Sequence, residues 1–268
     1  MLNVSIVIYK NPVSEISALI HELKSSEIVS EIFLIDNSPV QNAEFEKFEL
    51  NYIFTGKNIG YGAAHNIALR KSLEKNVDYH LVVNPDIVLK KNVLKEIADY
   101  MNKNIETGQI MPKIYYPDGQ IQYLCKLLPT PFDLFIRRFL PKKLTKKSMA
   151  RFEMRASDYD KIMDVPYLSG CFMFFRVSAL REIGLFDERF FMYPEDIDIT
   201  RRMHKRFRTV FYPEVSVIHN HARQSYVSFK MLKVHIVNII KYFNKWGWFF
   251  DKERKRINND IMAKIKLK

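Results

Sequence analysis

The segment Glu31-Ile32-Phe33-Leu34-Ile35-Asp36-Asn37-Ser38-Pro39 joins a short apolar run to a polar turn. An apolar run of this length, rich in β-branched and aromatic residues, is typical of a buried strand. The Asp-Asn-Ser-Pro sequence that follows is a strong turn signal, because these side chains favour turns over regular structure. The segment therefore predicts a core strand with polar residues directly after its carboxyl end.

Outward from this strand, the N-terminal half alternates between predicted strands and helices. Strands are predicted at Asn3–Tyr9, Asn51–Phe54 and His80–Val83, and helices at Val13–Ser25, Ala63–Lys75 and Val93–Met101. This alternation predicts an α/β fold with a mostly parallel sheet wrapped by helices. In such sheets ligands bind beyond the carboxyl ends of the strands. Four polar clusters follow these ends and predict a binding cleft: Tyr9-Lys10-Asn11, Asp36-Asn37-Ser38, Lys57-Asn58 and Asn84-Pro85-Asp86.

The second half of the chain has a less regular pattern. Strands are predicted at Gln109–Tyr116, Gln120–Leu124, Val165–Phe175, Arg208–Tyr212 and Val215–Ile218, and helices at Ser178–Ile183 and from Glu195 to about Phe207. Between them, residues 127–155 form a basic insertion that is punctuated by prolines and includes Arg137 and Arg138. We expect this insertion to be mobile or to dock on a surface.

The composition is strongly basic. The 268 residues carry 42 Lys and Arg against 30 Asp and Glu, a net charge of +12. This length allows one large α/β domain, or one domain with a tail. The charge predicts an anionic partner: nucleic acid, a phosphorylated small molecule or an anionic membrane surface. Two cysteines, Cys125 and Cys171, give no disulfide framework, and no apolar stretch is long enough to span a membrane, so we expect a cytoplasmic protein.

From Val227 onward, apolar and basic residues interleave at helical spacing. The aromatic cluster Trp246-Gly247-Trp248-Phe249-Phe250 follows them. A basic amphipathic helix with aromatic residues is one signature of interfacial membrane binding. A helix that packs on the core and continues into a solvated basic tail fits the pattern equally well, so both interpretations stay open.

The stretch Phe186–Asp198 is acidic in an otherwise basic chain. Its Pro194, Glu195 and Asp196 precede residues at helical spacing, and both proline and acids are favoured in the first turn of a helix. Helix capping alone explains these acids. A catalytic carboxylate at a cleft explains them together with the polar strand ends.

These motifs together resemble the inverting glycosyltransferases of family 2, which have the GT-A fold. The closest resemblance within the family is to the bacterial rhamnosyltransferase-like enzymes of O-antigen and surface-polysaccharide assembly. It runs from about Val4 to Ser225 and is carried by an ordered set of motifs: Tyr9-Lys10-Asn11, Ile35-Asp36-Asn37-Ser38, Asn58-Ile59-Gly60-Tyr61-Gly62 with Asn66, Asn84-Pro85-Asp86, Leu168-Ser169-Gly170, residues 184–193, Glu195-Asp196-Ile197-Asp198, and His219 with Ser225. It implies a GT-A domain at residues 1–226, made of a nucleotide-sugar half (1–105) and an acceptor half (106–226), before a basic helical segment at 227–268.

On the donor side, the resemblance implies that Asp36 recognises the pyrimidine base. A carboxylate can accept a hydrogen bond from the ring N–H of uracil or thymine. The loop of Asn58, Gly60 and Asn66 is implied to pass beneath the nucleotide and sugar. The other implied substrate-binding residues, all within the quoted motifs, are Tyr9, Asn84, Ser169 and Gly170.

The resemblance also implies a metal ion. The Asn84-Pro85-Asp86 motif lies where the family usually has Asp-x-Asp, so Asp86 is expected to hold Mg²⁺ or Mn²⁺ against the donor diphosphate. Asn84 replaces the first carboxylate, which predicts weak metal binding without substrate. His219 matches a position that completes the metal site or contacts the diphosphate, and His221 is a nearby substitute.

For the chemistry, the resemblance implies that Asp196 is the base, which takes the proton of the acceptor hydroxyl as it attacks the anomeric carbon. Glu195 is expected to orient the acceptor or the base, and Asp198 is the local alternative to Asp196. The leading donor is dTDP-L-rhamnose, with UDP-linked hexoses still open. The implied acceptor is a glycan on a polyprenyl diphosphate, which suits a peripheral protein on the anionic inner face of the cytoplasmic membrane.

Two other classes of protein explain less of the sequence. A sugar nucleotidyltransferase needs a glycine- and arginine-rich phosphate loop after the first strand, and Lys10-Asn11-Pro12-Val13 is not one. A non-catalytic module that binds nucleic acid or membrane needs basic residues interleaved with aromatics, which only the C-terminal segment offers. Because that module leaves Asp36, Asp86 and Asp196 unexplained, no nucleic-acid partner is expected.

Overall fold

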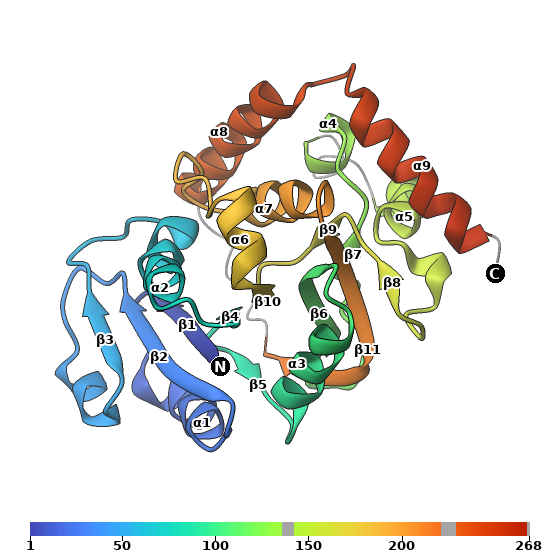
Figure 1. The fold of residues 1–268 in the computed structure, drawn as a ribbon. Helices are drawn as coiled ribbons and strands as arrows, with labels where there is room; N and C mark the ends of the chain where they lie inside the picture. The colour runs from blue at the N-terminus through green and yellow to red at the C-terminus, as the bar shows by residue number, and fades with distance from the viewer. Residues whose placement is uncertain (136–141, 221–228, 267–268) are drawn as a thin grey trace.

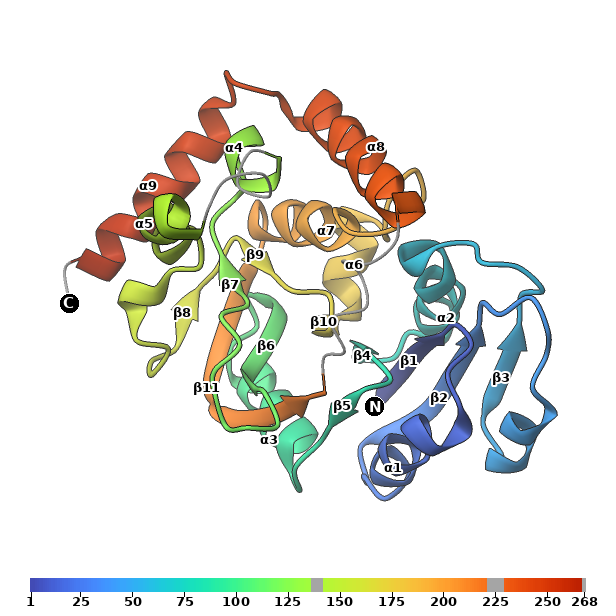
Figure 2. The same ribbon diagram turned by 180° about the vertical axis from the view of Figure 1, so that it is seen from behind.

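The computed structural model describes residues 1–135, 142–220 and 229–266. Within these ranges nine strands form one sheet, in the order β3-β2-β1-β4-β10-β6-β11-β5 with β8 paired to β11. Helices α1 and α3 pack on one face of the sheet and helices α2 and α6 on the other (Figures 1 and 2). The protein therefore has the layered α/β architecture that the sequence predicts.

The N-terminal half follows the predicted alternation closely. Its elements are β1 (Leu2–Ile8), α1 (Val13–Lys24), β2 (Val29–Asp36), the short helix η1 (Ala43–Phe48), β3 (Asn51–Phe54), α2 (Tyr61–Lys75), β4 (Tyr79–Val83), β5 (Ile87–Val88) and α3 (Val93–Lys103). Strand β1 pairs in parallel with β2 and β4, and β2 pairs in parallel with β3. The carboxyl ends of these strands consequently meet at one edge of the sheet.

The second half adds antiparallel pairing. Its elements up to the last strand are β6 (Thr107–Tyr115), β7 (Cys125–Lys126), α4 (Pro131–Leu134), α5 (Lys142–Phe152), η3 (Arg155–Ser157), β8 (Met163–Asp164), β9 (Tyr167–Leu168), β10 (Phe172–Arg176), α6 (Val177–Ile183), α7 (Glu195–His204) and β11 (Arg208–His219). Strand β10 runs antiparallel between β4 and β6, and β6 runs parallel to β11. The sheet is thus mostly parallel, with β10 reversed at its centre.

Four predicted strands differ in the structure. Val165–Phe175 is divided into β9 and β10 by the turn at Gly170. The predicted pair Arg208–Tyr212 and Val215–Ile218 is one strand, β11, whose register against β6 shifts between Tyr212 and Ser216. Residues Gln120–Leu124 do not form a strand, and only a single bridge joins Ile121 to Tyr115. The segment does meet the end of β6, where β10 no longer pairs: the Tyr116 N–H donates to the Gln120 carbonyl and the Gln122 N–H to the Ile114 carbonyl. The pairing stops there because from Cys125 the chain pairs with β9 instead.

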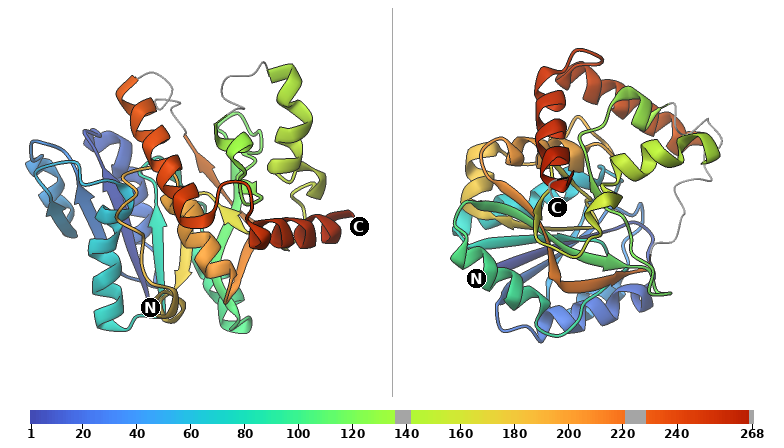
Figure 3. Two further views of the ribbon diagram at one scale, coloured as in Figure 1. Left: turned by 90° about the horizontal axis from the view of Figure 1, so that it is seen from above. Right: turned by 90° about the vertical axis from the view of Figure 1, so that its right-hand side faces the viewer.

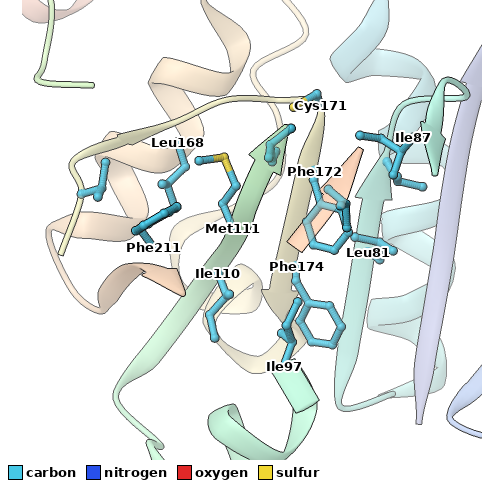
Figure 4. Close-up of a cluster of buried hydrophobic side chains, with 14 of the residues drawn as sticks. Leu81, Ile87, Ile97, Ile110, Met111, Leu168, Cys171, Phe172, Phe174 and Phe211 are labelled. Atoms are coloured by element: carbon cyan, nitrogen blue, oxygen red, sulfur yellow. The ribbon is translucent and has the colours of Figure 1, made fainter. Parts of the chain in front are cut away.

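The core occupies both faces of the central strands. Along β10, Phe172 and Phe174 join the cluster that includes α1 and α3, whereas Met173 and Phe175 pack against α6 and α7. Successive strand residues point to opposite faces, so a continuous apolar run has to be covered on both sides. Figure 4 shows Phe172 and Phe174 beside Leu81 in the first of these clusters.

The basic insertion and the C-terminal helices lie side by side. In the described part of the insertion, α5 lies beside α9 (Figure 2), and Phe152 at its end is buried in the core. The expectation of a mobile or surface-docking insertion is therefore wrong for this part, because its apolar residues complete the core. Arg137 and Arg138 lie outside the described residues.

The C-terminal segment forms two helices, α8 (Phe229–Trp246) and α9 (Lys252–Lys266). They lie along the upper side of the molecule in Figure 1 and in the right panel of Figure 3. Helix α8 buries Tyr242 and Phe243, and α9 buries Ile257, Ile261 and Ile265 at i, i+4 spacing. The inner faces thus pack on the core, as one of the two sequence interpretations required. In the described ranges, no helix has the length and apolar character needed to cross a bilayer.

Candidate active site

The candidate residues gather at the carboxyl edge of the sheet, between the end of β4 and the start of α7. The hydroxyl of Tyr61, in the first turn of α2, lies 3.1 Å from Asn84 Oδ1 and 2.7 Å from the carbonyl oxygen of Gly170. The Gly170 N–H donates to Asp196 Oδ2 over 3.0 Å. One chain of contacts therefore joins three motifs that are far apart in the sequence.

Asp196 is held by donors around the first turn of α7. Its Oδ1 accepts from the Ile197 N–H over 2.8 Å, and its Oδ2 accepts from Gly170 and lies 3.4 Å from the Tyr167 hydroxyl. Burial raises the pKa of Asp196 to about 6, while Lys126 and these donors act to lower it. A carboxyl group with this pKa is ionised at neutral pH and is still basic enough to take a proton.

Glu195 lies beside Asp196 in a different environment. Its side chain is 4% exposed, and its Oε2 has no hydrogen-bond partner among the described residues. Burial and the charge of Asp196 raise the pKa of Glu195 well above its usual value. Because two adjacent buried carboxyl groups resist double ionisation, the negative charge belongs on Asp196 and the proton on Glu195 near pH 7.

Asp198, the local alternative for the base, has a structural role. It is fully buried, and its Oδ1 accepts from Trp246 Nε1 over 2.8 Å and lies 2.6 Å from Lys245 Nζ. Its Oδ2 accepts from Arg202 Nε over 2.9 Å. Asp198 is therefore not a solvated helix position. It joins α8 to α7, and each of its carboxylate oxygens contacts a cation, which leaves Asp196 as the better candidate for the base.

Asp86 and His219 lie together just beyond the ends of β4 and β11. His219 Nε2 is 3.2 Å from Asp86 Oδ1, and its Nδ1 donates to Gln122 Oε1 over 2.9 Å. Burial acts to lower the pKa of His219, but its contacts with Cys171 and Asp86 outweigh burial and raise it to about 10. Across the described ranges no group of three or more His, Cys, Asp and Glu side chains converges, so this pair is the chain's contribution to a candidate cation site. His221 and Ser225 lie outside the described residues.

On the proposed nucleotide side, Asp36 ends β2 with both oxygens engaged. Its Oδ1 accepts from the Ser38 N–H over 2.8 Å and its Oδ2 from the Tyr52 hydroxyl over 2.7 Å. Each carboxylate oxygen can accept a second hydrogen bond, so Asp36 keeps capacity for a ligand N–H. Tyr9, one residue beyond β1, is 48% exposed and accessible.

Gly60 and Asn66 contact the chain that precedes α7, in addition to the substrate-binding roles predicted for them and for Asn58. Gly60 has φ +95°, and a Cβ there would lie 2.6 Å from the Phe191 carbonyl oxygen, so glycine permits the approach of the chain just before α7. Asn58 Oδ1 accepts from the Gly60 N–H over 3.0 Å. Asn66 is buried, and its amide bonds to the backbone of Phe186 in both directions, at 3.0 and 2.9 Å. Asn66 thus positions the chain before α7, and its contact with substrate stays a prediction.

Four residues at the site received no role from the sequence. Tyr61 lies inside one quoted motif and Tyr167 directly before another, so nearness to a motif was a usable signal for both. Gln122 and Lys126 lie in an irregular segment with no such signal. Ser169, by contrast, is placed beside Gly170 as expected, at the turn that leads into β10.

Comparison of the chain with known proteins identifies its family. The family model described as glycosyltransferase like family 2 matches residues 39–233. Over 184 residues the chain is 27% identical to an N-acetylglucosaminyl-diphospho-decaprenol L-rhamnosyltransferase of Mycobacterium tuberculosis, a match that covers 64% of this chain and 59% of that protein. Over 204 residues it is 28% identical to the rhamnosyltransferase WbbL of Escherichia coli, with 72% of this chain and 73% of that one covered.

Among solved structures, the mannosyltransferase PcManGT of Pyrobaculum calidifontis, in complex with GDP-Man and Mn²⁺, superposes with a TM-score of 0.56. The identity is 13%, and the match covers 90% of this chain and 64% of that one. This likeness concerns the fold, which is the GT-A fold expected from the motifs. The family match spans most of the chain and includes the acids at the start of α7. The chain therefore belongs to glycosyltransferase-like family 2.

Proposed function

We propose that this glycosyltransferase transfers L-rhamnose from dTDP-L-rhamnose, with inversion, to a hydroxyl of a glycan carried on a polyprenyl diphosphate. The observation that carries the proposal is the pair of buried acids at the start of α7, where Asp196 accepts from the Gly170 and Ile197 N–H groups and the adjacent Glu195 has a buried Oε2 without a hydrogen-bond partner among the described residues. The names of the mycobacterial and Escherichia coli relatives support the sugar, and the mycobacterial name supports the lipid-linked acceptor. Transfer of a hexose from a UDP-sugar is the second candidate, because a carboxylate such as Asp36 recognises the ring N–H of uracil and thymine alike.

In this reaction the acceptor oxygen bonds to the anomeric carbon as the bond from that carbon to the diphosphate oxygen breaks. Asp196 takes the proton of the hydroxyl, and the negative charge leaves with the nucleoside diphosphate. A single displacement inverts the anomeric centre and needs no covalent enzyme intermediate. Glu195, holding its proton, can donate a hydrogen bond to an acceptor oxygen and so orient it.

The pair of Asp86 and His219 fits a divalent cation, Mg²⁺ or Mn²⁺, provided that the cation displaces the proton that Asp86 helps to hold on His219 Nε2. A carboxylate oxygen and an imidazole nitrogen are ligands that Mn²⁺ accepts, and Mg²⁺ is commonly held by one carboxylate together with substrate phosphates. The archaeal mannosyltransferase structure contains Mn²⁺, which supports the same requirement here. Bound with the donor, the cation would neutralise the charge that develops on the leaving diphosphate.

We also propose that the protein works as a peripheral protein at the inner face of the cytoplasmic membrane. A polyprenyl-linked acceptor is confined to a membrane surface. The net charge of +12 suits contact with anionic lipid headgroups.

A donor screen tests the proposal. The purified protein is incubated with dTDP-L-rhamnose or a UDP-hexose, a polyprenyl-diphosphate-linked N-acetylglucosamine and Mn²⁺ or Mg²⁺, and nucleoside diphosphate release is measured. We expect release of dTDP that requires the acceptor and stops with a chelator. Release from UDP-sugars alone would move the conclusion to the second candidate. Thermal stabilisation by single-stranded DNA, with no donor consumed, would overturn the proposed function.

A further inference from the structure

The loop between α8 and α9 exposes two adjacent phenylalanines. Phe249 is 75% exposed and Phe250 is 98% exposed. The preceding Trp248 is anchored: its ring stacks on Phe135 with 6.2 Å between centroids, and its Nε1 donates to Asn244. Scattered exposed apolar residues are normal on a protein surface, but here two neighbouring rings, of which Phe249 contacts Trp248 with 6.5 Å between centroids, form an exposed apolar tip on an anchored base.

The surface around this tip is apolar and basic. On α8, Val237 and Ile240 are exposed on the side away from the buried Tyr242. Exposed lysines lie on both helices: Lys233 in the first half of α8, and Lys252 and Lys255 in the first turn of α9, next to the tip.

The C-terminal segment, residues 227–268, has few acids, and two of them pair with cations of the fold. Asp251 is buried against Arg201, and Glu253 pairs with Arg201 and Lys205. From residue 227 to 268 the sequence has eleven Lys and Arg against three Asp and Glu, so this segment carries most of the net charge of +12. An apolar tip among cations complements an anionic lipid surface.

The inner face of α8 holds the stretch that leads into the catalytic helix. Three contacts do this: Asn238 Nδ2 to the Met192 carbonyl (3.0 Å), Lys241 Nζ to the Arg189 carbonyl (2.8 Å), and the ring of His235 against that of Tyr193 (4.5 Å between centroids). Tyr193 has φ +93°, a conformation that L-residues rarely adopt, and lies two residues before Glu195. The same helix therefore carries the exposed surface on one side and the support of the active site on the other.

We propose that the Phe249–Phe250 tip and the outer face of α8 form a docking surface for an anionic lipid bilayer. The phenylalanines enter the boundary between headgroups and acyl chains, and the lysines contact the headgroups. The inference rests on the proposed function, because it identifies the membrane that carries the lipid-linked acceptor as the partner.

Vesicle co-sedimentation with the full chain tests the surface. The double variant Phe249→Ser/Phe250→Ser is compared with the parent on vesicles of phosphatidylglycerol and phosphatidylcholine. We expect at least about tenfold weaker partitioning for the variant, and weaker partitioning of the parent when salt is raised to about 0.5 M. The matched control is Ile105→Ser, which removes a side chain that is 77% exposed at the amino-terminal end of β6, and should bind like the parent. Nucleoside diphosphate release with a water-soluble acceptor should be equal in all three proteins.

Undiminished vesicle binding by the double variant would overturn the docking surface. So would a lipid-free dimer of the parent that the double variant abolishes, since the tip would then contact a second copy. Asp196→Asn separates this inference from the proposed function: it should bind vesicles normally and release no nucleoside diphosphate. If the parent binds vesicles through the tip but uses no sugar nucleotide, the proposed function fails and the docking surface stands.

Discussion

Replacing Asp196 by asparagine tests the assignment of the base most directly. The change keeps the size of the side chain and removes its ability to take a proton. General-base catalysis contributes about 10²–10⁴-fold to a rate, which corresponds to about 3–5 kcal/mol of barrier. We therefore expect nucleoside diphosphate release to fall by about two to four orders of magnitude, with donor affinity little changed.

The structure also sets the expected cost in stability. In Asp196 the two backbone donors use different oxygens, since Oδ1 accepts from Ile197 and Oδ2 from Gly170. Asparagine has one oxygen, so one of these hydrogen bonds is lost, at about 0.5–1.5 kcal/mol. A domain of this size then melts only a few degrees lower, on the order of 2–4 °C per kcal/mol.

The assay combines acceptor-dependent release of nucleoside diphosphate with calorimetric titration of the donor and thermal unfolding. Asp198→Asn is the matched control, because this acid lies on the same helix and is bound to Arg202, Lys245 and Trp246. It should lose mainly stability and retain turnover at a temperature where it is folded. Near-normal turnover by Asp196→Asn, or an equal loss of turnover in folded Asp198→Asn, would refute the assignment.

Three further perturbations have expected outcomes of their own. Asp86→Ala should weaken donor binding at least about tenfold in Mn²⁺ and leave it unchanged in chelator, as measured by calorimetry, because the carboxylate is expected to hold the cation against the diphosphate. Glu195→Gln should raise the melting temperature at about pH 8 and leave it nearly unchanged at about pH 4. The reason is that folding raises the pKa of Glu195: such a carboxyl group contributes stability below its unfolded pKa and loses that contribution as pH rises through its folded pKa. A loss of stability at both pH values would contradict this prediction. Arg201→Gln should lower the free energy of unfolding in urea by about 3–5 kcal/mol, because it leaves the buried Asp251 without the partner that now binds it at 2.7 and 2.9 Å; a change below about 1 kcal/mol would show that α9 does not depend on this pair.

The parallel half of the fold was predictable because burial on both faces leaves a local signal. A run such as Phe33–Ile35 followed by Asp36 identifies a core strand and its end without knowledge of its neighbours. The predicted strand at Gln120–Leu124 failed for a non-local reason. Its local pattern suits a hairpin with β6, and the Gln122 N–H does donate to the Ile114 carbonyl, but from Cys125 the chain pairs with β9, a strand that comes later in the sequence.

The roles of individual site residues were harder to predict because they depend on distant partners. Asp196 and Asp198 are two positions apart on one helix, and only contacts with Lys245 and Trp246, nearly fifty residues later, distinguish the base from the anchor. The role of Gly60 toward the nucleotide stays a prediction, whereas its close packing on the Phe191 backbone, far along the chain, had no signal in the sequence. The residue types were visible in the sequence, whereas the partners that assign their roles were not.

The start of α7 reconciles the two explanations that the sequence offered for its acids. Pro194 is the N-cap and makes no side-chain capping bond, so the first turn of the helix has free N–H groups. Asp196 accepts from one of these, at Ile197, and from Gly170, which favours its charged form despite burial. Glu195 has no such donor on Oε2 and holds the proton instead. Capping and the proposed catalysis are therefore compatible in one arrangement: the helix start favours the charged form of Asp196, and burial raises its pKa toward that of a general base.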